Sequence, residues 1–363
     1  MDGSTTTCLE HTSAQLIDQF GRHKHKLRIS LTDRCSYCMP DTPEWLAKKD
    51  ILSFEELLTF CEMMVSLGIR HIRLTGGEPL MRQGVVNFID ALNRLKPHGL
   101  ERISMTSNAF YLNKYARALK ETGLDDLNIS LDSIHADTFM NMTKRPIAPV
   151  LEGIAAAQQA NLPIKLNCVL VAGQNDHEVL ELTQWAYQQN IALRFIEYMP
   201  LDQPEHWQPK KVITEDNIIR ILEPHFQIQK QARQHDPATI YLLNDQYTLG
   251  IISTISKPFC QSCNRLRITA TGELFTCLFA NTGTPLRHLL QQKDLALLQA
   301  QILNAVWHKK AGFIEHQHAP TRKISMHAIG GQINSRVNFE FVRHSTVSAF
   351  IFVLSKYVIN FFS

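Results

Sequence analysis

The sequence predicts an α/β fold with a parallel sheet, either open or curled into a barrel. Strand-like and helix-like segments alternate five or six times between residues 27 and 200, which is typical of parallel strands joined by crossover helices. Polar clusters follow the predicted strands, at the end where the working residues of such folds lie. These clusters are Cys35/Cys38, Thr75–Glu78, Thr106–Asn108, Ser130–Asp132, Asn175/Asp176 and Glu197–Met199. Their convergence predicts an active site in the mouth of the barrel.

Length and composition limit the number of domains and the kinds of partner that the chain can have. A chain of 363 residues has room for one large α/β domain and a smaller partner. Its net charge of +3 is too small to indicate a nucleic-acid surface, although it permits a local basic pocket. The eight cysteines are spread along the chain, and their Cys-x2-Cys spacing favours metal binding in a reducing compartment. Residues 1–20 carry no apolar core and no arginine, so we expect no signal peptide and a cytoplasmic location.

The chain is expected to begin with a polar lead-in over residues 1–26. One short helix is predicted there, over Ser13–Phe20, before a glycine ends it. The first strand follows, because Leu27, Ile29 and Leu31 alternate with polar residues. This strand runs directly into the first pair of cysteines.

The next element is a helix with clear start and stop signals. Ser53 is a good N-cap and is followed by acidic residues in the first turn, and Gly68 ends the helix. Cys61 lies on the apolar face, which predicts a core residue rather than a ligand. Apolar periodicity then predicts strands over 69–74, 102–105, 126–131, 164–171 and 192–198, and helices over 85–95, 112–121, 147–160 and 177–189.

The alternation stops near Leu201. Beyond it we expect a helix over 215–222 and strands over 239–243 and 247–252, and then a helical and an extended stretch within 293–329. Residues 347–362 are rich in Phe, Ile and Val. Their uncharged part is shorter than the roughly 20 residues that span a bilayer, so a docked element or an aggregation-prone tail is expected.

Two groups of cysteines have the spacing of metal ligands. Cys35 and Cys38 form a unit that both zinc and iron–sulfur clusters use. Cys260, Cys263 and Cys277 form the second group. Three thiolates complete a tetrahedral zinc site only with a fourth ligand, whereas a cubane cluster with one open iron needs three. Spacing alone leaves both metals open.

Two arginines indicate an anionic ligand, and one buried lysine requires a partner. Arg265 and Arg267 project to the same side of an extended segment beside the second cysteine group, where guanidinium groups suit phosphate or carboxylate. The alternative is a solvated pair of arginines. Lys165 stands in an otherwise apolar strand, where a charge is costly without a partner. A structural salt bridge would supply one.

Several motifs together resemble one family. They are Asp18-x-Phe-Gly-Arg22, Leu27-Arg-Ile-Ser-Leu-Thr-Asp-Arg34, Tyr37-Cys-Met-Pro40, Arg73-Leu-Thr-Gly-Gly-Glu-Pro-Leu80, Asn128-Ile-Ser-Leu-Asp132, Arg194-Phe-Ile-Glu-Tyr-Met199, Phe259–Arg267 and Gly330-Gly331. The chain resembles the radical S-adenosylmethionine (SAM) GTP 3′,8-cyclases of molybdenum cofactor biosynthesis. The resemblance covers residues of about 18 to 331.

The resemblance implies a fold, two cofactors and a reaction. The fold would be an incomplete (β/α) barrel with a C-terminal cluster-binding segment, and there would be two [4Fe-4S] clusters. The N-terminal cluster would bind SAM and cleave it to a 5′-deoxyadenosyl radical. That radical would take the 3′ hydrogen of GTP, whose ribose carbon would then attack C8 of guanine. The cofactor would supply the chemistry and the protein the orientation.

The resemblance also implies roles for single residues. Cys35 and Cys38 would bind the N-terminal cluster, and Cys260, Cys263 and Cys277 the C-terminal one, which would hold the purine. The residues expected at SAM are Tyr37, Gly77, Ser130 and Met199. Those expected at GTP are Arg28, Arg73, Thr106, Lys165, Arg265 and Arg267, the last two also being the catalytic candidates. Gly330-Gly331 matches the tail that reaches into the active site.

This sequence departs from the family pattern at several points. The family motif is Cys-x3-Cys-x2-Cys, whereas here Cys35 and Cys38 stand alone, as though four residues were missing after Arg34 or Cys35. A further 32 residues follow Gly331. Milder departures are Ala109 in place of a glycine and His71 where a basic residue is common. A catalytically impaired relative that keeps GTP and the C-terminal cluster is therefore the alternative function.

The resemblance finally implies an organisation and partners. The expected segments are 1–26 as lead-in, 27–200 as barrel core, 201–331 as the cluster and GTP region, and 332–363 as an atypical hydrophobic tail. The product would pass to cyclic pyranopterin monophosphate synthase. An electron donor protein is expected, and a homodimer is compatible with the pattern. Neither a nucleic-acid partner nor a membrane association is expected.

Overall fold

The computed structural model describes residues 15–35, 45–200, 207–232 and 237–312. Its first six strands are β1 (Lys26–Ser30), β2 (His71–Thr75), β3 (Arg102–Ser107), β4 (Asp126–Ser130), β5 (Ile164–Leu170) and β6 (Ala192–Glu197). The later strands are β7 (Ile228–Lys230), β8 (Thr239–Leu243), β9 (Tyr247–Ile252), β10 (Arg265–Ile268), β11 (Glu273–Phe275) and β12 (Thr284–Pro285). Together they form one continuous sheet.

Parallel pairing dominates the centre of this sheet. Strands β1 to β6 pair in chain order, each parallel to the next. Strand β10 adds to β1 and strand β9 adds to β6, both also parallel. The outer strands are antiparallel, and the strand order runs from β12 at one end to β7 at the other. The sheet is thus an incomplete barrel, which confirms the predicted fold class.

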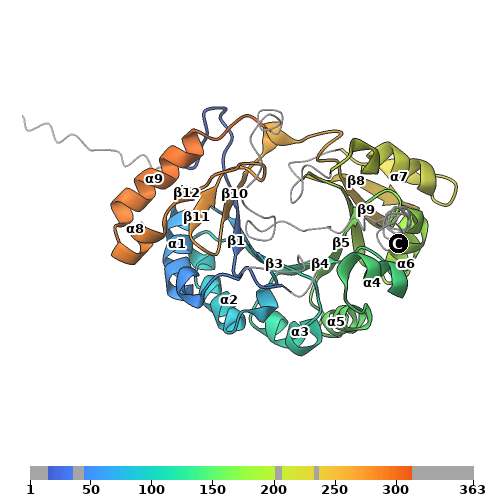
Figure 1. Ribbon diagram of the computed structural model, residues 1–363, viewed down its shortest axis with the longest axis horizontal. Coiled ribbons are helices and arrows are strands. Elements are labelled where there is room, and N and C mark those ends of the chain that lie inside the picture. The colour runs from blue at the N-terminus through green and yellow to red at the C-terminus, as the bar shows by residue number, and fades with distance from the viewer. Residues whose placement is uncertain (1–14, 36–44, 201–206, 233–236, 313–363) are drawn as a thin grey trace, which may run out of the picture.

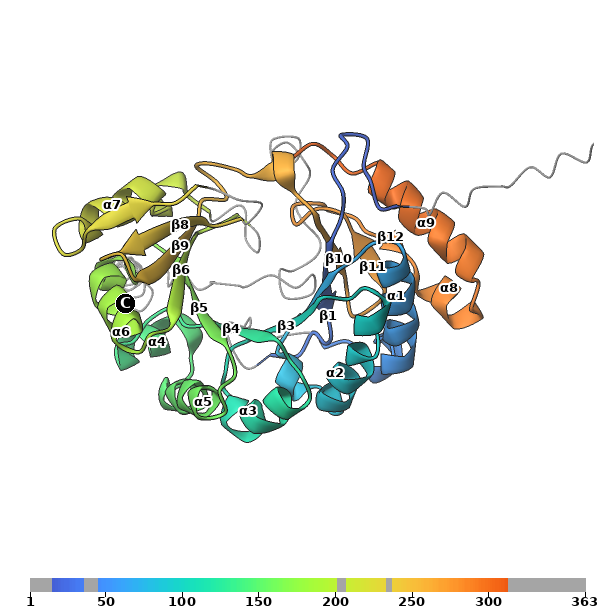
Figure 2. The ribbon, with the colours of Figure 1, turned by 180° about the vertical axis from the view of Figure 1, so that it is seen from behind.

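Helices cover the outside of the curved sheet, as the two opposite views show (Figures 1 and 2). They are α1 (Phe54–Ser66), α2 (Val85–Asn93), α3 (Leu112–Glu121), α4 (Ala136–Thr143), α5 (Ala148–Gln159), α6 (Val179–Gln188), α7 (Glu215–Leu222), α8 (Arg287–Gln292) and α9 (Leu295–Trp307). Within the described ranges, each helix is too short or too polar to cross a membrane.

The core lies between the sheet and these helices. Alternate strand residues such as Ile72 and Leu74 are fully buried, as are Leu57 and Phe60 of α1. Burial of each such side chain contributes about 1.5–3 kcal/mol. The residue between the two on β2, Arg73, instead lines a cavity. The two-residue period of a strand therefore separates an apolar outer face from a polar inner face.

The start of α1 shows how local sequence sets an element. The Ser53 hydroxyl accepts a hydrogen bond from the Glu56 backbone N–H at 3.1 Å, and the Glu56 carboxylate accepts one from the Ser53 N–H at 2.6 Å. This reciprocal capping box satisfies two backbone donors that the helix leaves open. Cys61 is fully buried on the inner face of α1, as predicted.

The structure corrects two expectations about elements. Residues 15–20 of the predicted helix Ser13–Phe20 are not helical, because Ile17 forms an antiparallel bridge with His23 around a turn. Gly21 takes a φ of +73° in that turn. Helix α4 was not predicted, since it follows β4 closely. The extended part of 293–329 and the apolar tail lie outside the described residues, as do Tyr37, Cys38 and Gly330-Gly331.

Candidate active site

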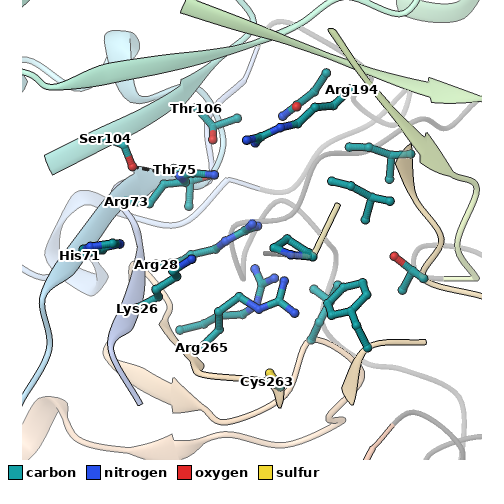
Figure 3. A pocket seen from close by; sticks show the side chains of 18 of the residues that line it. Lys26, Arg28, His71, Arg73, Thr75, Ser104, Thr106, Arg194, Cys263 and Arg265 are labelled. Carbon is teal, nitrogen blue, oxygen red and sulfur yellow. Dashed lines mark hydrogen bonds between the residues drawn. The ribbon is translucent and has the colours of Figure 1, made fainter. Parts of the chain in front are cut away.

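The inner face of the barrel lines one large cavity (Figure 3). Residues at every second strand position contribute to it, from the beginnings of the strands to their carboxyl ends. Many of their polar groups are cationic: the lining includes Lys26, Arg28, Arg73, Arg102, Lys165, Arg194, Arg265 and Arg267. Asp126 is the carboxylate among the lining residues. The arrangement suits a ligand that carries several negative charges.

The strand register brings the arginines together. Arg28 pairs with Arg73 of β2 on one side and with Arg267 of β10 on the other. Burial, and then the charges of Arg267 and Arg73, hold the pKa of Arg28 well below its usual value. Like charges on neighbouring strands oppose folding. A bound polyanion would compensate the repulsion among these arginines. Such a clustering of like charges, which lowers the stability of the fold, is typical of a binding site.

Strands β3 and β5 complete the wall of the cavity. The Arg73 Nε donates a hydrogen bond to the Ser104 hydroxyl at 3.0 Å, which fixes the direction of that guanidinium. Thr106 lines the cavity two residues further along β3. Lys165 also lines it, and burial lowers the pKa of its ammonium, with the neighbouring Arg194 adding to the effect. All six residues expected at GTP thus line the same cavity.

The second cysteine group forms another part of this wall. Cys260, Cys263 and Cys277 all line the cavity, beside Arg265. Burial would raise the pKa of the Cys263 thiol, but the charges of Arg265 and Lys309 outweigh it and lower this pKa to about 6. A thiolate, the form that binds metals, is therefore favoured at neutral pH. Arg265 also stacks over the Phe259 ring, 4.7 Å from its centroid.

A second group of residues gathers at the carboxyl ends of β1, β2 and β3. The buried Glu78 carboxylate accepts hydrogen bonds from the Ser107 hydroxyl at 2.9 Å and the Asn108 N–H at 2.7 Å. Burial raises the pKa of Glu78 to about 7. The Asn108 amide donates to the Cys35 sulfur at 3.6 Å. Cys35 therefore lies beside the turn that carries Gly77.

Gly77 is required by close approach of the backbone. Its φ is +52°, and a Cβ atom there would lie 2.2 Å from the Arg34 carbonyl oxygen. Met199 lines the cavity. Ser130 ends β4 and pairs with Asn167, another lining residue. These three residues, expected at SAM, lie at or near the carboxyl ends of the strands.

Some polar clusters at strand ends have structural tasks instead, which corrects the idea that all of them converge on one site. The Asn175 amide donates to the Asp132 carbonyl at 2.7 Å, and the Asp132 carboxylate accepts from the Val169 N–H at 2.9 Å. The Glu197 carboxylate accepts the Ile255 and Ser256 N–H groups, at 2.8 and 2.9 Å. These side chains anchor backbone between strands.

The part of the cavity near the amino-terminal ends of the strands was not predicted from the sequence. Lys26, His71 and Arg102, the first residues of β1, β2 and β3, line it, together with Arg194 of β6. Their signal was present as charged residues two apart in apolar strands, for example Lys26 with Arg28. Such a period predicts a polar inner face.

The fold is that of a radical SAM protein. Residues 32–186 match the Radical SAM superfamily, and residues 191–314 match the Molybdenum Cofactor Synthesis C family. The crystal structure of SuiB from Streptococcus suis bound to S-adenosylmethionine is similar in fold, with a TM-score of 0.55 at 13% identity. That similarity covers 74% of this chain and 65% of SuiB.

The more specific relationship comes from relatives in sequence. The chain is 41% identical to the GTP 3′,8-cyclase of Streptomyces coelicolor over 82% of this chain and 90% of the relative. It is 39% identical to that of Geobacter sulfurreducens, over 87% and 100%. It is 32% identical to that of Aquifex aeolicus, over 87% and 100%. The chain belongs to the GTP 3′,8-cyclase family.

Membership implies a [4Fe-4S] cluster and SAM, and the residues present fit these groups unequally. The wall with Cys260, Cys263 and Cys277 suits a cluster with three thiolates. Among the described residues, no three His, Cys, Asp or Glu side chains converge on a single metal ion. The first motif supplies one cysteine fewer than the family pattern. Cys61 and Cys168 are fully buried in the core, where burial raises their thiol pKa values.

Proposed function

We propose that this chain is a GTP 3′,8-cyclase, which converts GTP to (8S)-3′,8-cyclo-7,8-dihydroguanosine 5′-triphosphate in the first step of molybdenum cofactor biosynthesis. One observation carries the proposal. Cationic side chains line the barrel interior and meet the three C-terminal cysteines in the same cavity. Family membership supports the same substrate. Cleavage of SAM would supply the radical that takes the 3′ hydrogen.

The chain's own residues would bind and orient the nucleotide. Arg28, Arg73 and Lys165, which line the cavity, would bind the triphosphate, with Thr106 as a hydroxyl partner. Arg265 and Arg267 line the same cavity as the cysteines, where they would hold the purine end and stabilise charge during ring closure. The apolar Met199 and the close turn at Gly77 suit SAM, and Ser130 and Tyr37 complete the proposed SAM contacts.

The cysteines divide between two proposed clusters. We assign Cys260, Cys263 and Cys277 to a second [4Fe-4S] cluster, and Cys35 with Cys38 to the first. Transfer of the product to cyclic pyranopterin monophosphate synthase, an electron donor protein and a homodimer belong to the same proposal. The segments 27–200 and 201–331 would then carry the SAM and the GTP side of the reaction.

A second function is favoured by the short first motif. With Cys35 and Cys38 as the motif's thiolates, the N-terminal cluster would lack a ligand. The chain would then bind GTP through the cavity without cleaving SAM. This reading predicts normal nucleotide affinity and no 5′-deoxyadenosine.

One experiment separates the two functions. Anaerobically reconstituted protein is incubated with dithionite, SAM and GTP, and then iron, 5′-deoxyadenosine and the cyclised product are measured. Eight irons per chain with both products support the cyclase. Four irons, bound GTP and no cleavage support the second function. An insertion of Cys-Ala-Ala-Ala after Arg34 restores the family spacing, and under the second function it should restore cleavage. Absence of GTP binding would contradict both.

A further inference from the structure

The motif Asp18-x-Phe-Gly-Arg22 has no task in the site described so far, yet its charged side chains are buried. Asp18, Arg22 and Lys24 are 1%, 9% and 1% exposed. The Asp18 carboxylate accepts hydrogen bonds from the Arg22 Nε and the Lys24 Nζ, both at 2.7 Å. Lys309, from the other end of the described chain, is 2% exposed. We call these four residues the cation cluster.

The cation cluster holds the backbone of the C-terminal cysteine turns. Arg22 donates to the Cys260 carbonyl at 2.7 Å, and Lys24 donates to the Cys263 carbonyl at 3.0 Å. Lys309 donates to the carbonyl of Thr276, the residue before Cys277. Each cysteine thus has one buried cation on its own carbonyl or on the one before it.

Arg22 has further contacts that tie the same turns to the C-terminal segment. Its guanidinium donates to the Lys310 carbonyl at 2.8 Å and the Ala311 carbonyl at 2.7 Å. The next residue, Gly312, packs on Cys260: a Cβ there would lie 3.1 Å from the Cys260 sulfur. The cation cluster therefore fixes both the cysteine turns and the chain that passes over them.

The charge balance indicates more than structural support. Among the residues that the structure describes, three cations face one carboxylate, and their other partners are neutral carbonyl groups and the Phe20 ring, whose centroid lies 4.8 Å from the Arg22 guanidinium. Buried charge is costly unless it is paired. Cys260, Cys263 and Cys277, whose turns these cations hold, are the residues that would bring a negatively charged cluster next to them. The excess positive charge would be compensated by a bound anionic cluster.

We propose that Arg22, Lys24 and Lys309 are positioning residues for the iron–sulfur cluster at Cys260, Cys263 and Cys277, and that their charge favours its reduced form. The inference rests on the proposed function, because it assumes that cluster. Reduction adds one negative charge, which nearby buried cations stabilise. The backbone contacts would also hold the three thiolates at the spacing that the cluster needs.

The test uses the full-length chain with Cys35→Ala and Cys38→Ala, so that iron reports on the C-terminal site. The protein is reconstituted with iron and sulfide under argon. Iron per chain and the midpoint potential are then measured, the latter by redox titration followed by electron paramagnetic resonance. Two variants remove opposite charges from the cation cluster, Lys24→Met and Asp18→Asn. Lys96→Met is the matched control, because Lys96 pairs with Asp125 at 3.0 Å elsewhere in the chain.

The two variants are expected to shift the potential in opposite directions. Lys24→Met should make it more negative, Asp18→Asn more positive, and Lys96→Met should leave it unchanged. Shifts of the same sign, or none, in folded and iron-loaded variants would overturn the inference alone. If Lys24→Met fails to fold, the sign for Asp18→Asn, which keeps the volume, decides. Absence of iron in the parent would overturn both this inference and the proposed second cluster.

Discussion

The turn after β2 gives a prediction whose magnitude follows from the geometry. Replacing Gly77 with alanine would place a Cβ 2.2 Å from the Arg34 carbonyl oxygen and 2.8 Å from that of Thr32. Both contacts are with backbone, so no side chain can rotate away. In addition, Gly77 has a φ of +52°, a left-handed conformation that costs an alanine about 1–2 kcal/mol.

Gly173 is the matched control. Its φ is +80°, but a Cβ added there would meet nothing within 4 Å. Gly173→Ala should therefore cost only the conformational term, about 1 kcal/mol after the gain from a less flexible unfolded chain. Gly77→Ala should cost about 2–4 kcal/mol, because overpacking adds about 1–3 kcal/mol. The difference of about 2 kcal/mol measures the close approach of the two backbone segments.

Urea unfolding followed by circular dichroism measures both values. Equal losses of unfolding free energy for the two variants would refute the reasoning, because the turn at Gly77 would then have space for a Cβ atom, contrary to the structure. Binding of SAM to Gly77→Ala gives an independent reading. The turn must open to accept the methyl group of the new alanine. We therefore expect the affinity of Gly77→Ala for SAM to fall at least tenfold, roughly 1.4 kcal/mol, while Gly173→Ala binds SAM as the parent does.

Three further predictions use other parts of the molecule. Ala109→Gly should change unfolding free energy by less than about 0.5 kcal/mol, because relief of its φ of 59° offsets the lost methyl group, whereas Ala116→Gly within α3 should lose about 1.5–2 kcal/mol. Glu215 has a pKa lowered to about 2, since hydrogen bonds from Tyr241 and others outweigh burial. The stabilisation from its carboxylate is present above about pH 4.5 and is lost as the pH is lowered toward 2. The difference in unfolding free energy between the parent and Glu215→Gln should therefore shrink by about 2 kcal/mol from pH 6 to pH 3 in urea titrations. A constant difference would contradict this. Arg28→Met should weaken GTP binding at least tenfold in calorimetry, roughly 1.4 kcal/mol, and an unchanged affinity would contradict the cavity assignment.

Much of the fold could be predicted because its signals are local. The helix Leu112–Glu121 and the strands Thr239–Leu243 and Tyr247–Ile252 have the bounds that their apolar periodicity predicts. The short helix near the N-terminus was wrong, because Ile17 pairs with a residue across a turn and the pairing overrides helix propensity. Contacts between distant segments, such as β1 with β10, have no local signal.

The candidate site was predictable where one residue type has one purpose. Cysteines at metal-ligand spacing indicate a metal site, and a glycine such as Gly77 in a tight turn indicates close approach of the backbone. Asn175 and Glu197 do not, because an amide or carboxylate at a strand end can equally hold backbone. The role of Lys24 could not be predicted either, because its ammonium is buried against a carbonyl that lies 239 residues away along the chain.

The pairing of β1 with β10 has a consequence for synthesis on the ribosome. Strands β2 to β6 each find their neighbour as soon as it emerges, because they pair in chain order. Strand β1 meets β10, whose Arg265 lies opposite Lys26, only after the ribosome has added some 240 residues, which takes about 10–50 s. During that interval one edge of the first strand stays open, and Arg22 and Lys24 have none of their C-terminal carbonyl partners. A nascent chain arrested before residue 260 therefore exposes the edge and the charges that the finished protein buries.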